Sequence, residues 1–343
     1  MQALNRLCQQ IKPRDHKIEE EIKTAWGAEK TSYGKLVDMV AQYGSCLGAV
    51  NPPVPKPCMV IASADHGIVK MGVSAYPQST TIGMTTNYLI PKGAGANALA
   101  NYCGASMVVV DMGINADMSQ VPGLRHCKIR KGTRNFLREP AMTEEEAEKA
   151  IMAGVTIAQE EVKKGHTVFL VGEMGIANTT AAAVMTALFS GLSAKEATGR
   201  GSNISDERLK VKTQVVAQAL EKYKDIGSED GFHILQCVGG YEFACLVGVI
   251  LGAAAQGAMT IIDGFNTTAC ALVAHTMAPA CMDYVMASHL SAEKAHIDAL
   301  KTLGLTAYVD LKLCLGEASG GAIQAGMLEM AVRIYQALQK KEG

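Results

Sequence analysis

The 343-residue sequence is poor in aromatic side chains and nearly balanced in charge. Only 5% of its residues are Phe, Trp or Tyr, and its formal net charge is −1. A near-neutral chain has no strong field to attract nucleic acid or an anionic membrane surface. Its longest apolar run, LVGVILGAAAQGAMTII, is rich in Ala and Gly and is interrupted by Gln256. We interpret this run as a buried helix leading into a strand. We therefore expect neither nucleic acid nor a membrane as a partner.

The signatures of several common enzyme classes are also missing. The ten cysteines include no C-x-x-C pair, and the eight histidines form no H-E-x-x-H site. There is no G-x-S-x-G elbow, no Walker loop and no G-x-G-x-x-G after a strand, so hydrolases, kinases and dehydrogenases are disfavoured. We expect no metal and no cofactor. Scattered cysteines in a chain this long are typical of reduced thiols, and the N-terminus lacks the apolar core of a secretion signal. Both features predict a cytoplasmic protein.

Short apolar segments rich in β-forming residues alternate with helical segments after the proline-rich stretch NPPVPKP at 51–57. The predicted strands cover residues 58–64, 105–111, 167–173, 258–263 and 283–288, and the predicted helices cover 143–164, 178–190, 207–223, 239–256 and 266–277. This alternation predicts right-handed βαβ units in an α/β fold, with a Rossmann-like, doubly wound and mostly parallel sheet.

The two ends of the chain are expected to form a separate helical part. The N-terminal segments ALNRLCQQI, HKIEEEIKTAW and YGKLVDMVAQY each carry apolar residues about one helical turn apart. We predict that residues 1–50 together with 320–343 form a small helical domain. Residues 51–319 would then form the α/β nucleotide-binding domain.

Four predicted strands end in an acid near a glycine. These ends are Asp65-His66-Gly67, Asp111-Met112-Gly113, Gly172-Glu173-Met174-Gly175 and Asp263-Gly264. Each alone is typical of a turn, but together they favour a site, because ligands bind beyond the carboxyl ends of parallel strands. In GEMGIANTT the glycines would let backbone N–H groups approach a ligand, and the helix that follows suits a phosphate. A simple helix cap at Asn178 is the plainer alternative.

Two further segments carry chemically suggestive residues. GRGSNISDERL (199–209) repeats the glycine-then-helix design, and its Arg200 either neutralises a phosphate or pairs with a surface acid. LGEASGGAI (315–323) places Glu317 between a predicted strand end and the last helix. A carboxylate in an apolar pocket has the raised pKa of a general base, although a glutamate stabilised by the helix dipole is the simpler explanation. Asp263 lacks the adjacent second acid of pyrophosphate-donor loops, which argues against a magnesium-pyrophosphate donor.

The order of these motifs resembles one enzyme family. The stretches are ADHGI, PKGAGANALA, VVDMGI, GTRNF, VGEMGIANTTAAA, GRGSNISDERL, VGGYE, IIDGFNTTACAL, ASHLSAEKAH and LGEASGGAI. From about residue 30 to the C-terminus the chain resembles the nicotinate-nucleotide:dimethylbenzimidazole phosphoribosyltransferases of cobamide (vitamin B12-type) lower-ligand assembly. The combination of GEMGIANTT, SHLSAE and LGEASG is highly specific.

The resemblance implies an enzyme that moves the ribose phosphate of nicotinate mononucleotide to an aromatic base, releasing nicotinate and giving an α-ribotide. It implies a Rossmann-like fold, a dimer, Glu317 as general base and Glu173 facing the ribose. The nucleotide-binding residues that it implies are Gly175, Ile176, Ala177, Asn178, Thr179, Gly201, Ser202, Asn203, Asp263, Gly264, Ser291 and Leu315. The base pocket that it implies comprises Tyr76, Gly83, Met84 and Tyr88.

The sequence departs from the family around this base pocket. The family commonly has a serine where Tyr76 stands and a glutamine around 83–84, where this chain has Gly83 and Met84. We therefore expect an acceptor such as phenol or p-cresol, because family variants with that activity exist and are built as pairs of unlike subunits. The alternatives are that dimethylbenzimidazole still binds, or that the chain is a non-catalytic paralogue that binds nucleotide and stabilises a catalytic partner. Retention of Glu317 and Glu173 argues against the paralogue.

Overall fold

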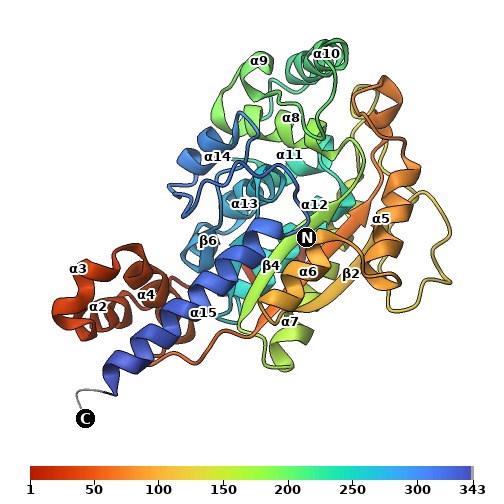
Figure 1. Cartoon of the computed structure of the whole chain (residues 1–343). Helices are drawn as coiled ribbons and strands as arrows, with labels where there is room; N and C mark the ends of the chain where they lie inside the picture. Colours follow the sequence, from red (N-terminus) through yellow and green to blue (C-terminus); the bar gives the residue numbers. More distant parts are fainter. Residues whose placement is uncertain (341–343) are drawn as a thin grey trace.

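The structure is a computed structural model that describes residues 1–340. Its centre is one six-stranded, all-parallel sheet with the strand order β3-β2-β1-β4-β5-β6 (Figure 1). The strands are β1 (Pro57–Ala64), β2 (Ser106–Gly113), β3 (Arg125–His126), β4 (Val168–Met174), β5 (Met259–Ile262) and β6 (Val285–Ala287). This order is that of doubly wound nucleotide-binding sheets, in which ligands bind where the strand order reverses, here between β1 and β4. The predicted fold class is confirmed.

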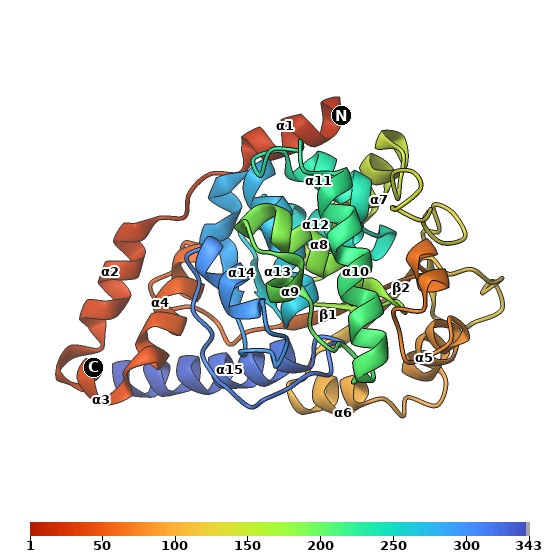
Figure 2. The ribbon, with the colours of Figure 1, turned by 90° about the horizontal axis from the view of Figure 1, so that it is seen from above.

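Helices cover both faces of the sheet. The helices of eight or more residues are α1 (Gln2–Gln10), α2 (His16–Ala25), α4 (Lys35–Leu47), α5 (Ser79–Leu89), α6 (Gly95–Tyr102), α7 (Glu144–Lys163), α8 (Asn178–Ser190), α10 (Asp206–Lys222), α11 (Gly231–Val238), α12 (Tyr241–Ala254), α13 (Phe265–Met277) and α15 (Ser319–Gln339). Helices α5, α6 and α15 lie on one face, whereas α7, α12 and α13 lie on the other (Figures 1 and 2). No helix among residues 1–340 is both long and apolar enough to span a bilayer.

The structure contains elements that the sequence pattern did not predict. Helices α5, α6, α11 and α14 (His296–Thr302) and the two-residue strand β3 were missed. Helix α5 has the sequence STTIGMTTNYL, in which Thr and Gly have poor helix propensity. The predicted strand end before Glu317 is wrong, because residues 310–316 contain no strand. That segment instead crosses the pocket described below as an irregular chain.

The N-terminal helices pack against the far end of α15, as the domain prediction supposes. The Trp26 ring lies 5.4 Å from the Tyr335 ring, and the Tyr335 hydroxyl donates to the Val50 carbonyl oxygen over 3.0 Å. Helix α15 also packs on β4 and β5, so one helix serves both the helical part and the sheet. The boundary between 1–50 with 320–343 and 51–319 therefore remains a prediction, and residues 341–343 lie outside the described part.

Helices α7 and α12 approach so closely that glycines are required between them. A Cβ built at Gly154 would lie 1.9 Å from the Cys245 carbonyl oxygen, and one at Gly248 would lie 1.9 Å from the Ile151 carbonyl oxygen. Both distances are far below van der Waals contact, and in each case the obstacle is backbone. The pair of helices can pack only where side chains are absent.

We therefore predict that Gly154→Ala and Gly248→Ala each destabilise the protein by about 1–3 kcal/mol through overpacking. Chemical denaturation measures this change. The matched control is Gly83→Ala, since Gly83 is helical and a Cβ there meets nothing within 4 Å. That control should stabilise the protein by about 0.5–1 kcal/mol. Equal effects of all three substitutions would contradict the prediction.

Candidate active site

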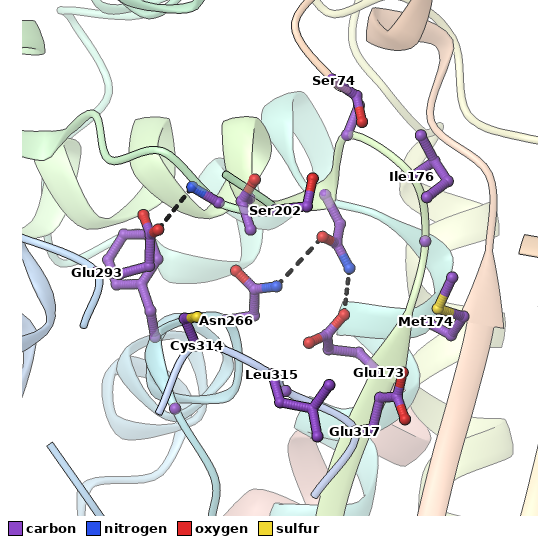
Figure 3. A pocket seen from close by; sticks show the side chains of 18 of the residues that line it. Ser74, Glu173, Met174, Ile176, Ser202, Asn266, Glu293, Cys314, Leu315 and Glu317 are labelled. Carbon is purple, nitrogen blue, oxygen red and sulfur yellow. Dashed lines mark hydrogen bonds between the residues drawn. The ribbon is translucent and has the colours of Figure 1, made fainter. Parts of the chain in front are cut away.

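The segments that follow β1, β4 and β5 enclose a cavity of about 540 Å³ (Figure 3). Its volume lies in the range of small-molecule sites. The predicted site residues that line it are Glu317, Glu173, Gly175, Ile176, Ala177, Asn178, Thr179, Gly201, Ser202, Asn203, Asp263, Gly264, Ser291, Leu315, Tyr76 and Met84. Residues from distant parts of the chain thus meet at the carboxyl edge of the sheet.

Two predicted base-pocket residues do not line this cavity. Gly83 is exposed on α5, whereas Tyr88 is buried behind the cavity wall. The Tyr88 hydroxyl faces the Glu317 carboxyl, where it opposes the effect of burial on the pKa of that carboxyl. Asp65 and His66 also lie outside the lining. Asp65 accepts from the Asn115 backbone N–H over 2.8 Å, and His66 Nε2 lies 2.5 Å from Glu242 Oε1, so both hold loops in place.

The glycines around Glu173 make room for other parts of the protein. A Cβ at Gly172 would lie 2.5 Å from the Ala318 nitrogen, and one at Gly175 would lie 2.4 Å from the Ala64 carbonyl oxygen. The sequence predicts that these glycines admit a ligand close to the backbone. Instead the backbone at Glu317 and Ala318 packs directly on the end of β4. This contact places the two glutamates in one cavity.

Glu173 belongs to a buried chain of hydrogen bonds. Asn266 Nδ2 donates to Asn178 Oδ1 over 3.2 Å, and Asn178 Nδ2 donates to Glu173 Oε2 (Figure 3). Burial raises the pKa of Glu173 to about 8, with a smaller contribution from the charge of Glu242, whereas Asn266 and Asn178 oppose the rise. Burial therefore favours the protonated form of Glu173.

Glu317 is held by an unusual stretch of backbone. Gly316, Glu317 and Ala318 have φ angles of +78°, +60° and +61°, and two of the three carry side chains in a region that favours glycine. Asp263 Oδ1 anchors the helix that follows, because it accepts from the N–H groups of Gly320 at 2.6 Å and Gly321 at 3.2 Å. Burial raises the pKa of Glu317 above its ordinary value.

The other end of the cavity combines a backbone N–H group with a buried ammonium group. The Gly201 N–H lies there beside Thr179, and the ammonium group of Lys212 is directly behind them. Lys212 Nζ donates to Thr179 Oγ1 over 3.1 Å and to the Gly199 carbonyl oxygen over 3.0 Å. Burial lowers the pKa of Lys212 to about 8. The negative charge of Glu293 opposes this lowering.

Arg200 follows the plainer of its two predicted alternatives. Its guanidinium pairs with the exposed Asp206 and donates to the Ile204 carbonyl oxygen over 2.8 Å. It therefore stabilises the 199–206 loop, although it also borders the cavity.

Several residues that shape the site were not predicted from the sequence. Lys212, Asn266 and Glu293 contact the predicted residues directly, and Arg208 Nη1 donates to the Ser74 carbonyl oxygen next to Tyr76. Lys212 lies on a helix with many charged residues, where its spacing distinguishes it little from solvated lysines. The sequence carries a signal for Asn266, because this residue follows Asp263-Gly264 at a predicted helix start.

One group of potential metal ligands occurs among residues 1–340, and it lies away from the cavity. Cys58, Glu161 and His166 are buried and have donor atoms within 4.8 Å of one another. Cys58 begins β1 and His166 precedes β4, so the group sits at the amino ends of the strands. Ser106 and Lys164 already hydrogen-bond to His166 and Glu161, which explains the cluster as a structural network.

Comparison with known proteins agrees with this architecture. A family model described as Phosphoribosyltransferase matches residues 11–343. The chain belongs to this family. A nicotinate-nucleotide–dimethylbenzimidazole phosphoribosyltransferase of Geobacter sulfurreducens is 41% identical over 88% of the chain and 86% of the relative. One of Chlorobaculum tepidum is 37% identical over 96% and 94%.

A solved structure also matches the fold of this phosphoribosyltransferase. The crystal structure of CobT from Thermus thermophilus superposes with a TM-score of 0.88 at 36% identity, and covers 93% of this chain and 96% of that chain. Family membership makes the protein an enzyme that transfers a phosphoribosyl group. The roles of individual residues at the cavity are taken up below as proposals.

The buried carboxyl of Glu173 predicts a pH-dependent stability difference. Its pKa is about 8 in the folded protein and near 4.5 ordinarily, so the folded protein holds a proton that the unfolded chain loses above about pH 4.5. The contribution of this proton to the free energy of unfolding is fully present below about pH 4.5 and is lost as the pH rises through 8. Glu173→Gln removes the titration, so its free energy of unfolding relative to wild type should rise from about pH 5 to pH 8.5. One pKa unit corresponds to about 1.4 kcal/mol.

Urea denaturation of both proteins across this pH range measures the difference. Glu207→Gln on the exposed start of α10 serves as the control, since its carboxyl is solvated and should give a flat difference. A flat difference for Glu173→Gln as well would show that Glu173 is ionised in the folded protein at neutral pH.

Proposed function

We propose that the enzyme transfers the 5-phosphoribosyl group of nicotinate mononucleotide to an aromatic acceptor, with Glu317 as general base. The products are nicotinate and an α-linked ribotide. The observation that carries this proposal is that different chemical groups line the two ends of one cavity. Glu317 lies at one end, the Gly201–Lys212 anion site lies at the other, and Glu173 lies between them. The names of the relatives support the same donor and acceptor class.

The proposed step balances without a metal or a pyrophosphate donor. The bond between the sugar C1′ and the pyridinium nitrogen breaks, and its electron pair returns to nitrogen to give neutral-ring nicotinate. The acceptor forms the new bond to C1′ from the opposite face and so inverts the β-linkage to α. Its proton passes to the Glu317 carboxylate. Positive charge develops at C1′, and a carboxylate such as Glu173 stabilises it.

The raised pKa of Glu173 is consistent with this role. Without a cationic ligand beside it, the neutral form of its carboxyl is favoured. A neutral Glu173 lowers the free-energy cost of burying it together with Glu317 and Asp263. A cationic pyridinium donor beside it lowers its pKa by opposite charge. Donor binding would therefore ionise Glu173 when the negative charge is needed.

The first test replaces the proposed base. Glu317→Gln keeps the shape of the side chain but cannot accept a proton, so kcat should fall by about 10²–10⁴-fold, the usual contribution of such a group. The KM for nicotinate mononucleotide should change little, because the anion end of the cavity is intact. Steady-state rates, with nicotinate release followed by chromatography, measure both quantities.

Glu329→Gln is the matched control, since Glu329 lies on α15, the helix that follows Glu317, and pairs with Arg333 outside the cavity. It should behave as wild type. Full turnover by Glu317→Gln would refute the role of general base, whereas absence of turnover in the wild type with every acceptor would favour the non-catalytic paralogue.

We further propose that the acceptor is a phenol, such as phenol or p-cresol. Tyr76 and Met84 border the cavity where the family carries smaller or more polar side chains, and Met174 lies on the same wall. Large side chains there reduce the room for a two-ring base, and a thioether offers no partner for a ring nitrogen. A phenol would give an O-glycosidic ribotide, and its hydroxyl proton would pass to Glu317.

The acceptor proposal is tested by competing phenol or p-cresol against dimethylbenzimidazole, alone and with a co-encoded paralogue. The double variant Tyr76→Ser/Met84→Gln should shift the ratio of kcat/KM values towards dimethylbenzimidazole by roughly tenfold or more, about 1.4 kcal/mol. Tyr102→Ser is the control, because Tyr102 is an exposed aromatic residue outside the cavity. Absence of phenol and p-cresol turnover under every condition would leave dimethylbenzimidazole as the acceptor.

A further inference from the structure

Glu293 places a carboxylate at the end of the cavity that is otherwise suited to an anion. Its Oε1 accepts from the Gly201 N–H over 2.6 Å (Figure 3). Its Oε2 is buried and has no hydrogen-bond partner among residues 1–340. A Cβ at Gly199 would lie 2.0 Å from Oε2, so the loop is shaped closely around the carboxylate. A buried carboxylate oxygen without a partner is costly, and this cost calls for a functional explanation.

The groups around Glu293 are those that a phosphate monoester would use. Gly201 offers a backbone N–H, and Lys212 Nζ lies 3.4 Å from the Cβ position of that glycine. Lys212 is 1% exposed and donates only to neutral oxygens. The negative charge of Glu293 partly offsets the desolvation of this lysine. A carboxylate and a phosphate present similar anionic oxygens, so one can take the place of the other.

The two anions cannot occupy this site together. Gly201 has one N–H, and a phosphate dianion beside an ionised carboxylate would be repelled strongly in a partly dry cavity. The loop geometry is also demanding, since Gly201 and Asn203 have φ angles of +55° and +63°. A resident carboxylate keeps this loop in its binding shape while the site is empty. Removing the carboxylate charge should therefore favour a phosphate.

We propose that Glu293 is a positioning residue that occupies the anion site of the 199–203 loop in the empty enzyme and is displaced by the 5′-phosphate of a phosphoribosyl substrate. The proposal rests on the proposed function for the identity of that substrate. Its consequence is selectivity, because a riboside without a phosphate has nothing to exchange for the carboxylate. The backbone around Glu293 is held by the Ser291 hydroxyl, which accepts from the Glu293 N–H over 3.3 Å, and by the Ala292 N–H, which donates to the Leu313 carbonyl oxygen over 2.9 Å. The proposed exchange therefore requires movement of the Glu293 side chain.

The test measures binding of inorganic phosphate and ribose 5-phosphate by calorimetry, which needs no turnover. Glu293→Gln should bind both roughly tenfold more tightly than wild type, since the competing charge is gone. Glu293→Asp should also bind more tightly, because its shorter side chain cannot reach Gly201. In steady-state assays the KM for nicotinate mononucleotide should fall, while kcat changes by less than about threefold, a difference of well under 1 kcal/mol.

Two further variants locate the effect. Glu207→Gln removes a charge from the exposed start of the adjacent α10 and should leave phosphate binding unchanged. Lys212→Met should weaken phosphate binding in both the wild-type and the Glu293→Gln backgrounds, which would place the ion at Gly201. Thermal melting curves that match wild type would exclude misfolding of the Gln variant.

A change in phosphate affinity or in KM opposite to the expected one overturns the proposal. If Glu293 instead binds the ribose hydroxyls or only stabilises the loop, Glu293→Gln will raise the KM and weaken or leave unchanged the binding of phosphate. Tight phosphate binding by Glu293→Gln without any transferase activity in the wild type would support the anion exchange and count against the proposed function. The two failures are therefore distinguishable.

Discussion

The hydrogen bonds from the first turn of α15 to Asp263 position the rest of the site. Asp263 directly follows β5, and its carboxylate accepts from the Gly320 and Gly321 N–H groups, so the last helix begins at a fixed point on the sheet. Gly172 then allows the preceding backbone to lie directly on β4. Glu317 is thereby forced into the left-handed region and into the cavity. A carboxylate at a helix N-terminus is favourable in itself, since it meets both free N–H groups and the helix dipole.

The same packing of α15 on the sheet brings several buried carboxyl groups close together. Their burial affects the pKa of each group. Burial raises the pKa of Asp263 to about 6 and that of Glu173 to about 8. Asp263 rises less because backbone N–H groups stabilise its charged form, whereas Glu173 has amide side chains as partners. Burial thus raises the pKa values of these neighbouring carboxyls to different extents. Such differences allow one acid to take a proton while another stabilises positive charge.

The sequence predicts the sheet well because its central strands are near-continuous apolar runs between glycines and acids. Residues 58–64, 167–173 and 258–263 closely match β1, β4 and β5. Helix α5 escaped prediction because its threonines and glycine have weak helix propensity, and packing on β1, β2 and β4 stabilises it instead. Strand β3 has only two residues, too few for any pattern to show.

For the site, the acids and glycines at strand ends located the cavity, since parallel strands bring those ends together. The sequence predicts that the glycines around Glu173 admit a ligand, whereas in the structure they admit other backbone segments. A sequence does not reveal which backbone segments pack against each other. Gly172 meets Ala318, a residue 146 positions later in the chain by difference of their numbers. Glu293 and Gly201 likewise come together only through the fold. Contacts of this kind depend on tertiary packing and leave no local signal.

Backbone atoms form one part of the cavity wall, and side chains form another. One part of the cavity is built mainly from backbone at glycine turns, with Lys212 buried beside it, and these positions depend on the end of β4 and on the starts of α8 and α10. Another part, proposed to hold the acceptor, is bordered by the side chains of Tyr76 and Met84 from the segment after β1. A side chain on α5 can change size or polarity without moving a strand end, whereas a change at Gly172 or Gly201 moves backbone. The proposed acceptor side is therefore the part of the cavity that this fold can alter at the least structural cost, whereas the proposed base and the proposed phosphate site depend on backbone positions.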